Sequence, residues 1–288
     1  MKLNRKLFSG LLLILLFLCA AVLFGVYDLS ISERLFNDKN AFARGMEDFG
    51  VLVEPYLMIL SGLTLAVYFI TARDIRIRPL KLLFSVLCVL GGLAYSGVVY
   101  GRLGEIGRIA ALIVTCILAG LWTFWLSRCH FPRLYQMMQI AAITAFYIIA
   151  ALLVVQVLKM LWGRVRFREL KDLSEFTSWF LPQGMTGHHS FPSGHTSNAA
   201  SLWVVTLFIP LVEKKWQKFL CGVLPALWIA AMAFSRVIAG AHYASDTLFG
   251  AAVTIALFYP IRHAVLQRTG ALSANSTGTS HDVPHTPQ

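Results

Sequence analysis

The sequence predicts an all-α fold, a polytopic membrane helical bundle of about eight transmembrane helices. Of its 288 residues, 57% are hydrophobic and only 14% are charged, and the mean hydropathy is +0.68. A soluble domain of this length is rarely so apolar. The apolar residues also fall into separate runs, several of which approach the roughly 20 residues that an α-helix needs to cross a bilayer.

The charged residues and cysteines exclude other classes of protein. The net charge is +11, but nucleic-acid binding requires a basic face on a soluble module, and these cations lie in short segments between apolar runs. The five cysteines include no CxxC pair, so neither a disulfide framework nor a zinc site is indicated. We therefore expect a lipid bilayer as the surroundings, no nucleic acid and no obligate protein partner.

The first predicted element follows a short basic segment. The apolar run 7–27 is long enough to cross a bilayer. A cleaved signal peptide has a shorter core and a small-x-small site, so we interpret this run as an uncleaved first span. The mixed-charge segment 28–50 is predicted to be a loop.

Seven further apolar runs are predicted to span the membrane, and two of them, 196–212 and 219–234, are short for free-standing helices. They lie at 51–71, 80–100, 109–127, 136–158, 196–212, 219–234 and 243–261. We divide the chain into N-terminal transmembrane helices (1–135), a helical core made of the last four helices (136–268) and a Ser/Thr/Pro-rich tail (269–288) that we expect to be disordered and cytoplasmic.

The loop charges predict the orientation. With the amino terminus inside the cell, more than half of the 25 Lys and Arg residues fall in cytoplasmic segments, as the positive-inside rule requires. Both termini are then cytoplasmic, and the ends of the spans at residues 159, 195, 236 and 243 lie on the extracytoplasmic side.

A polar turn, Ser-Phe-Pro-Ser-Gly-His at 190–195, begins the sixth predicted span. Pro192 has a fixed φ and Gly194 lacks a Cβ, so backbone N–H groups at the start of the helix can approach an anion. Ser193 adds a hydroxyl donor, and His195 can exchange a proton near neutral pH. Taken alone, the turn also fits an ordinary helix cap.

Two more polar segments lie on the same predicted side. The first runs from Lys159 to Arg168, and the second contains Ser235-Arg236 followed by His242 and Asp246. His242 and Asp246 are four residues apart and share a helix face. The carboxylate is then expected to accept the imidazole Nδ1–H and leave Nε2 free to attack.

The remaining groups suit a phosphate ligand. Lys159, Arg166 and Arg236 provide cationic donors for its oxygens, and the Ser193 hydroxyl and the Gly194 N–H complete the cradle. His195 remains for the leaving group. One carboxylate among several basic groups is a poor magnesium site, so we expect no metal and no cofactor.

These residues resemble the three signature motifs of the type 2 phosphatidic acid phosphatase family, whose relatives include glucose-6-phosphatase and the vanadium haloperoxidases. The motifs are Lys159 with Arg166, residues 192–195, and Ser235-Arg236 with His242 and Asp246. The second and third match in residue and spacing. In the first, Phe167 replaces the family's proline, which should loosen the turn after Arg166 without removing a phosphate ligand.

The resemblance implies a metal-independent mechanism on these residues. His242 would be the nucleophile that forms a phosphohistidine, and Asp246 would orient it. His195 would protonate the leaving group and then activate water. Lys159, Arg166, Ser193, Gly194 and Arg236 would hold the non-bridging oxygens. The core 136–268 would then be the catalytic phosphatase core.

We therefore expect a multi-pass lipid phosphatase, in a bacterial cytoplasmic membrane, with an extracytoplasmic active site. Its substrate would be a lipid phosphomonoester or diphosphate such as undecaprenyl diphosphate, phosphatidylglycerol phosphate, phosphatidate or a lipid A phosphate. Two alternatives remain open: a lipid phosphotransferase that uses the same site, and a transporter or binding protein that only holds a lipid phosphate.

Several neighbouring polar residues are left outside the predicted site. Arg164, Arg168 and Lys171 are interpreted as loop cations that contact anionic lipid headgroups without specificity. His188 and His189 are interpreted as an exposed loop pair rather than as metal ligands.

Overall fold

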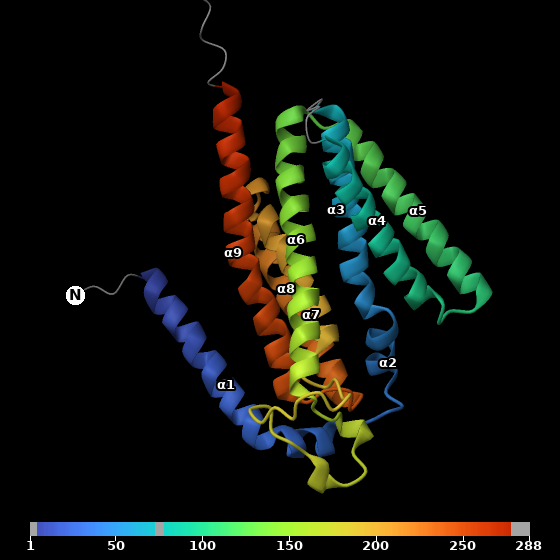
Figure 1. The fold of residues 1–288 in the computed structure, drawn as a ribbon, viewed down its shortest axis with the longest axis vertical. Coiled ribbons are helices and arrows are strands. Elements are labelled where there is room, and N and C mark those ends of the chain that lie inside the picture. Colours follow the sequence, from blue (N-terminus) through green and yellow to red (C-terminus); the bar gives the residue numbers. More distant parts are fainter. Residues whose placement is uncertain (1–4, 73–77, 278–288) are drawn as a thin grey trace, which may run out of the picture. The chain divides into compact units, whose positions relative to one another are not determined.

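The computed structural model describes residues 5–72 and 78–277, and every regular element in those ranges is helical (Figure 1). The longer helices are α1 (Arg5–Leu35), α3 (Val53–Thr71), α4 (Arg78–Tyr100), α5 (Glu105–Ser127), α6 (Phe131–Trp162), α8 (Lys215–Ile238) and α9 (Ala244–Thr277). The shorter α-helices are α2 (Ala41–Asp48) and α7 (Gly194–Ala200). Four 3₁₀ helices, η1 to η4, are Gly50–Leu52, Phe167–Glu169, Leu173–Glu175 and Ser201–Leu211.

Seven helices within the described ranges are long and apolar enough to cross a membrane. Large apolar side chains on them are exposed, among them Leu13 (67%), Leu153 (64%) and Phe219 (65%). Such a surface is stable in contact with lipid but not with water. The predicted all-α polytopic membrane bundle is therefore confirmed, and the protein is a multi-pass membrane protein.

The predicted sixth span, 196–212, is not one of those seven helices. Its residues form the short helix α7 followed by the 3₁₀ helix η4, and both pack along α8 (Figure 1). A 3₁₀ helix has a longer rise per residue and a narrower radius than an α-helix. The segment is thus continuously helical, first α and then 3₁₀, and it packs against α8.

Two ends of the predicted elements also differ from the structure. Helix α1 continues past residue 27 to Leu35, and α2 occupies part of the predicted loop 28–50. Helix α9 continues past residue 269, where the disordered tail was predicted to begin, through Ala271 and Leu272, which are good helix formers. The rest of that tail, 278–288, lies outside the described residues.

The chain forms two compact units, and α6 and α9 contribute to both. The first unit contains residues 1–54 and 149–255, and the second contains 55–148 and 256–288. The division predicted at residues 135 and 268 stays a prediction. All the predicted site residues belong to the first unit.

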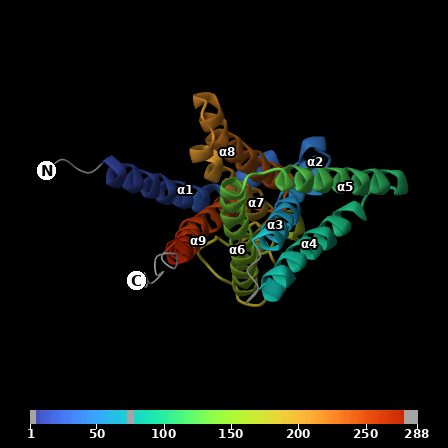
Figure 2. The ribbon, with the colours of Figure 1, turned by 90° about the horizontal axis from the view of Figure 1, so that it is seen from above.

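Within the first unit, α1 packs on the rest through only part of its length. Its buried residues are Ala21, Gly25, Asp28 and Ser32, one per turn of the C-terminal half, whereas residues 10–16 are exposed. Both views show the N-terminal half of α1 standing clear of α8 (Figure 1 and Figure 2). The half that packs thus presents a single narrow face to the unit.

Within the second unit, α3 and α4 approach closely at two glycines. A Cβ on Gly62 would lie 2.6 Å from the carbonyl oxygen of Ser85, and one on Gly92 would lie 2.6 Å from that of Pro55. Small residues permit such contact between helices in a membrane. A hydroxyl network of Tyr56, Tyr100 and Thr115 also joins α3, α4 and α5.

Candidate active site

The turn at residues 190–195 is held in place by the start of α7 and by α9. Ser193 is the N-cap of α7, and its Oγ accepts a hydrogen bond from the backbone N–H of Thr196 at 3.3 Å. Its own backbone N–H donates to the carbonyl oxygen of Asp246 at 2.9 Å. The cap uses the hydroxyl as an acceptor, so the hydroxyl hydrogen is available to an anion. The helix-cap and phosphate-donor interpretations are therefore compatible.

Two glycines let other groups approach this turn closely. A Cβ added to Gly194 would lie 2.9 Å from the Nζ of Lys159, at the end of α6. A Cβ added to Gly250 in α9 would lie 2.5 Å from the carbonyl oxygen of Ser193. The structure thus places the Lys159 ammonium group directly against the N-terminus of α7, where both attract an anion.

His242 lies in the turn between α8 and α9, and its side chain is buried. Its Nδ1 is 2.6 Å from the carbonyl oxygen of Ser190 and 3.7 Å from Oδ2 of Asp246. A carbonyl oxygen only accepts hydrogen bonds, so Nδ1 carries the proton and Nε2 is free. The predicted hydrogen bond from His242 to Asp246 is wrong, because the backbone of the turn takes that place.

The surroundings of His242 favour its neutral form. Burial lowers the pKa of His242 below its ordinary value, and the charges of Lys159 and Arg166 act in the same direction against the opposing effect of Asp246. The ring of His195 lies 6.5 Å from that of His242, measured between centroids. A neutral imidazole and a second histidine therefore lie close together, and Lys159 is among the charges that act on the first of them.

Asp246 is fully buried and fixed by three donors. Its Oδ1 accepts from Arg164 at 2.6 Å, and its Oδ2 accepts from the Ser190 hydroxyl at 2.5 Å and from the backbone N–H of Tyr243 at 3.0 Å. The hydroxyl and the carbonyl of Ser190 thus link Asp246 to His242. Asp246 supports His242 through this shared residue and through its charge.

Arg164 and Asp28 form an ion cluster with Asp246, although Arg164 was interpreted as a loop cation and Asp28 was predicted to lie in a loop. Arg164 is 1% exposed, and its guanidinium lies between Asp246 and the α1 residue Asp28, whose Oδ2 is 3.0 Å away. Burial would lower the pKa of Arg164, but the charges of Asp246 and Asp28 raise it. A carboxylate inside an apolar helix needs such a partner, but Asp28 was predicted to lie in a loop, so this signal was lost.

The two arginines that were predicted to bind phosphate each contact a carboxylate. Arg166 donates from a terminal nitrogen to Glu169 at 2.8 Å, and its buried Nε has no hydrogen-bond partner. Arg236 is fully buried at the end of α8; one terminal nitrogen donates to the carbonyl oxygen of Ala43, and the other lies 3.1 Å from Glu47. Arg166 therefore contributes its charge to the His242 site, whereas the guanidinium of Arg236 contacts α2.

The loop histidines are not among the buried residues around His242. His188 and His189 are exposed, and Nδ1 of His188 is 3.8 Å from Glu169. Within residues 5–72 and 78–277, no group of three or more His, Cys, Asp or Glu side chains is arranged to hold a metal ion.

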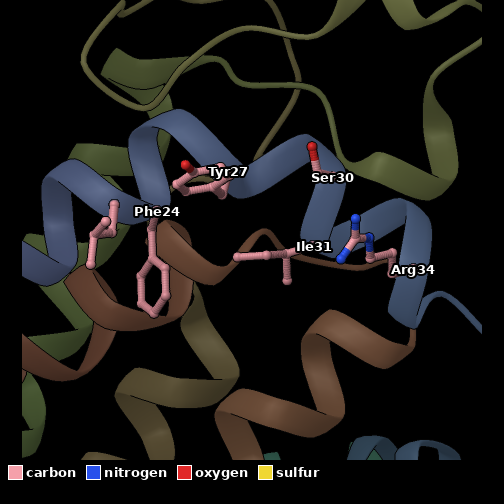
Figure 3. Close-up of a pocket in the computed structure, with 6 residues that line it drawn as sticks. Phe24, Tyr27, Ser30, Ile31 and Arg34 are labelled. Carbon is pink, nitrogen blue, oxygen red and sulfur yellow. The ribbon is translucent and has the colours of Figure 1, made fainter.

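An apolar hollow of about 400 Å³ lies on α1. In Figure 3, Phe24 and Ile31 project from the same side of the helix, with Arg34 near one end. The full lining is Leu23, Phe24, Tyr27, Ser30, Ile31 and Arg34. Asp28 lies on the same turns of the helix but is buried. One segment of α1 thus contributes residues both to the hollow and to the ion cluster of Asp28, Arg164 and Asp246.

Together, the long apolar helices and the convergent His, Arg and Lys side chains define a class: a polytopic membrane protein with a cluster of basic and imidazole groups at the ends of its helices. Residues 140–269 match the family model of the PAP2 superfamily. The chain therefore carries a PAP2 superfamily domain, as the motif resemblance predicted, and the domain and apolar helices support a membrane phosphatase. No curated protein and no solved structure gives a significant match to the chain.

Proposed function

We propose that the protein is a lipid phosphatase that hydrolyses a lipid phosphomonoester or diphosphate through a phosphohistidine on His242. The observation that carries the proposal is the contact between Nδ1 of His242 and the Ser190 carbonyl oxygen, which leaves Nε2 unprotonated. His195 lies across from it, and Lys159 lies against the α7 N-terminus. A nucleophile, an acid–base group and a cationic phosphate site thus occupy one place.

The proposed reaction has two steps. In the first, Nε2 of His242 attacks phosphorus, the bond from phosphorus to the leaving oxygen breaks, and His195 donates a proton to that oxygen. In the second, His195 takes a proton from water, the water oxygen attacks phosphorus, and the P–N bond breaks to release phosphate and free His242. The same histidine serves as acid and then as base.

Charge stabilisation is assigned to the surrounding donors. Lys159, the Ser193 hydroxyl and the Gly194 N–H hold the non-bridging oxygens, together with Arg166, whose buried Nε lacks a partner. Arg236 joins them when its contact with Glu47 opens. These cationic groups occupy the role that a metal ion fills in other phosphoryl-transfer enzymes, so the reaction is proposed to need no metal.

The lipid nature of the substrate rests on the surroundings of the site. The helices that carry it expose apolar side chains, and the hollow on α1 is wide enough for part of a hydrocarbon chain. Undecaprenyl diphosphate, phosphatidylglycerol phosphate, phosphatidate and lipid A phosphates are the candidates. We place the site on the extracytoplasmic face of a bacterial cytoplasmic membrane with both termini inside, on the distribution of loop cations. In this arrangement α7 and η4 together make the eighth crossing, in addition to the seven long helices.

The proposal is tested by phosphate release from a panel of these lipids by detergent-purified protein in EDTA. We expect release from at least one lipid, its loss in His242→Ala and His195→Ala, and its retention in the matched control His189→Ala, which removes an exposed loop histidine. The fastest lipid identifies the substrate class. Absence of release from every lipid, or full activity of His242→Ala, overturns the proposal.

The same assay separates the two alternatives. A phosphotransferase releases little free phosphate unless water replaces its acceptor, and it labels an added acceptor lipid in a His242-dependent manner. A transporter or binding protein retains the lipid phosphate unchanged and is insensitive to His242→Ala.

A further inference from the structure

Helix α1 carries a buried carboxylate well before the region that matches the superfamily. Asp28 is fully buried; its Oδ1 accepts from the backbone N–H of Ser245 at 2.9 Å. Its Oδ2 accepts from Arg164 at 3.0 Å and from the Ser245 hydroxyl. Each contact is with a residue next to the predicted catalytic groups, so this helix reaches the centre of the site.

Each nitrogen of the Arg164 guanidinium donates a hydrogen bond. Its Nε donates to the Thr177 carbonyl oxygen at 2.8 Å, one terminal nitrogen donates to Asp246, and the other donates to Asp28. Its guanidinium carbon also lies 4.0 Å from the centre of the Tyr243 ring. A planar guanidinium held by two carboxylates and a carbonyl has one orientation. Asp28 therefore determines where Arg164 meets Asp246.

The contacts continue to the nucleophile. Asp246 accepts from the Ser190 hydroxyl, and the Ser190 carbonyl accepts from His242. Asp28, Arg164, Asp246, Ser190 and His242 thus form an unbroken chain of short polar contacts. Outer partners of this kind commonly orient a catalytic histidine and adjust its basicity.

We propose that Asp28 is a positioning residue for the reaction and acts on His242 through Arg164 and Asp246, so that α1 is part of the catalytic apparatus. This inference rests on the proposed function. The competing view is that the ion cluster only attaches α1 to the rest of the unit. Under that view, losses of activity follow losses of folded protein, and the chemistry of His242 does not change.

The test compares purified Asp28→Asn with Glu33→Gln, which removes a carboxylate from an exposed position of α1. The amide keeps the shape of Asp28 but removes its charge. For the folded fraction isolated by size exclusion, we expect kcat to fall about 10- to 100-fold in Asp28→Asn, with KM within about threefold of wild type. The Glu33→Gln variant should retain wild-type values.

The pH profile gives a readout that simple attachment would not move. Asp28→Asn removes a negative charge, disfavours protonated His242 and shifts the acid limb of kcat/KM to lower pH. Arg164→Gln removes a positive charge and shifts that limb to higher pH. Lys159, Arg166, His195 and Asp246, the other charged or titratable groups acting on His242, are unchanged in both variants.

A double variant keeps the test valid if Arg164→Gln folds poorly. Arg164→Gln alone leaves two buried carboxylates without their cation, so Asp28→Asn in the same chain should raise its folded yield and kcat. Opposite shifts of the acid limb with this rescue support the inference. If wild type releases phosphate and Asp28→Asn matches Glu33→Gln, this inference alone fails; a wild type that releases none overturns both.

Discussion

Nδ1 of His242 donates its proton to the carbonyl oxygen of Ser190 at 2.6 Å, while the nearest Asp246 oxygen is 3.7 Å away. A backbone acceptor cannot exchange or lose its role with pH, unlike a carboxylate. The imidazole is thus held as one tautomer, with Nε2 unprotonated, by an atom that does not titrate. The charge of Asp246 then serves to stabilise whatever positive charge develops on the ring.

The lowered pKa of His242 predicts the acid limb of activity. Because burial favours the neutral ring, the proton binds only below the ordinary histidine value of about 6.5. We expect kcat/KM to stay constant as the pH falls towards that value and to decline below it. The profile is corrected for the phosphate of the substrate, which itself titrates at about pH 6. A limb centred above the ordinary histidine value would contradict the assigned surroundings.

Asp246→Asn should destabilise the protein as well as inactivate it. The carboxylate accepts hydrogen bonds from Arg164, Ser190 and the Tyr243 backbone. The NH2 group of an asparagine would face one of these donors, and neither could accept a hydrogen bond from the other. Breaking a buried ion pair costs about 3–5 kcal/mol, so the thermal midpoint in detergent should fall by about 10 °C. Asp38→Asn, at an exposed position, is the control, and equal midpoints for the two variants would refute the buried network.

Gly250→Ala should reduce turnover by displacing the turn at residues 190–195, which we propose binds phosphate. The new methyl group would lie 2.5 Å from the Ser193 carbonyl oxygen, so α9 or the turn has to move. Displacements of about 1 Å can cost about 100-fold in rate, and we expect kcat to fall by that order. In the same helical unit, Gly222→Ala meets no atom within 4 Å and should leave kcat unchanged; a Gly250→Ala enzyme of normal kcat would show that the close approach is unimportant.

Glu47→Gln should strengthen anion binding. Glu47 lies 3.1 Å from Arg236, one of the predicted phosphate ligands, and its carboxylate competes with phosphate for that guanidinium. Removing a contribution of about 1 kcal/mol should lower the inhibition constant for inorganic phosphate or vanadate by about fivefold. Glu33→Gln provides the charge-matched control. An unchanged or higher constant would mean that Glu47 orients Arg236 rather than competing for it.

The fold and most of the cluster could be predicted from the sequence because both depend on local patterns. Apolar runs of membrane length predict the helices, and polar motifs at the ends of runs meet when those ends share a side. Lys159, Ser193, Gly194, His195, His242 and Asp246 lie together for that reason. The 3₁₀ segment η4 was missed because an apolar run does not distinguish it from an α-helix.

The residues that sequence reasoning missed depend on long-range contacts or on the backbone. Asp28 and Arg164 are 136 residues apart in sequence, so neither indicates the other. The acceptor at Ser190 is a backbone carbonyl, a group that every residue type has. Only the folded turn directs it at His242. Arg236 was expected among the phosphate ligands by its charge, but its contact with Glu47 requires α2, which lies in a segment predicted to be a loop.

Rapid-quench trapping of the phosphorylated protein with radiolabelled lipid phosphate tests the phosphohistidine on His242 directly. We expect transient label on wild type, mapped to His242, and none on His242→Ala. On His195→Ala the label should form and decay more slowly, because His195 is the acid of the first step and the base of the second. Label on another residue, or equal labelling of His242→Ala, would contradict a phosphohistidine on His242.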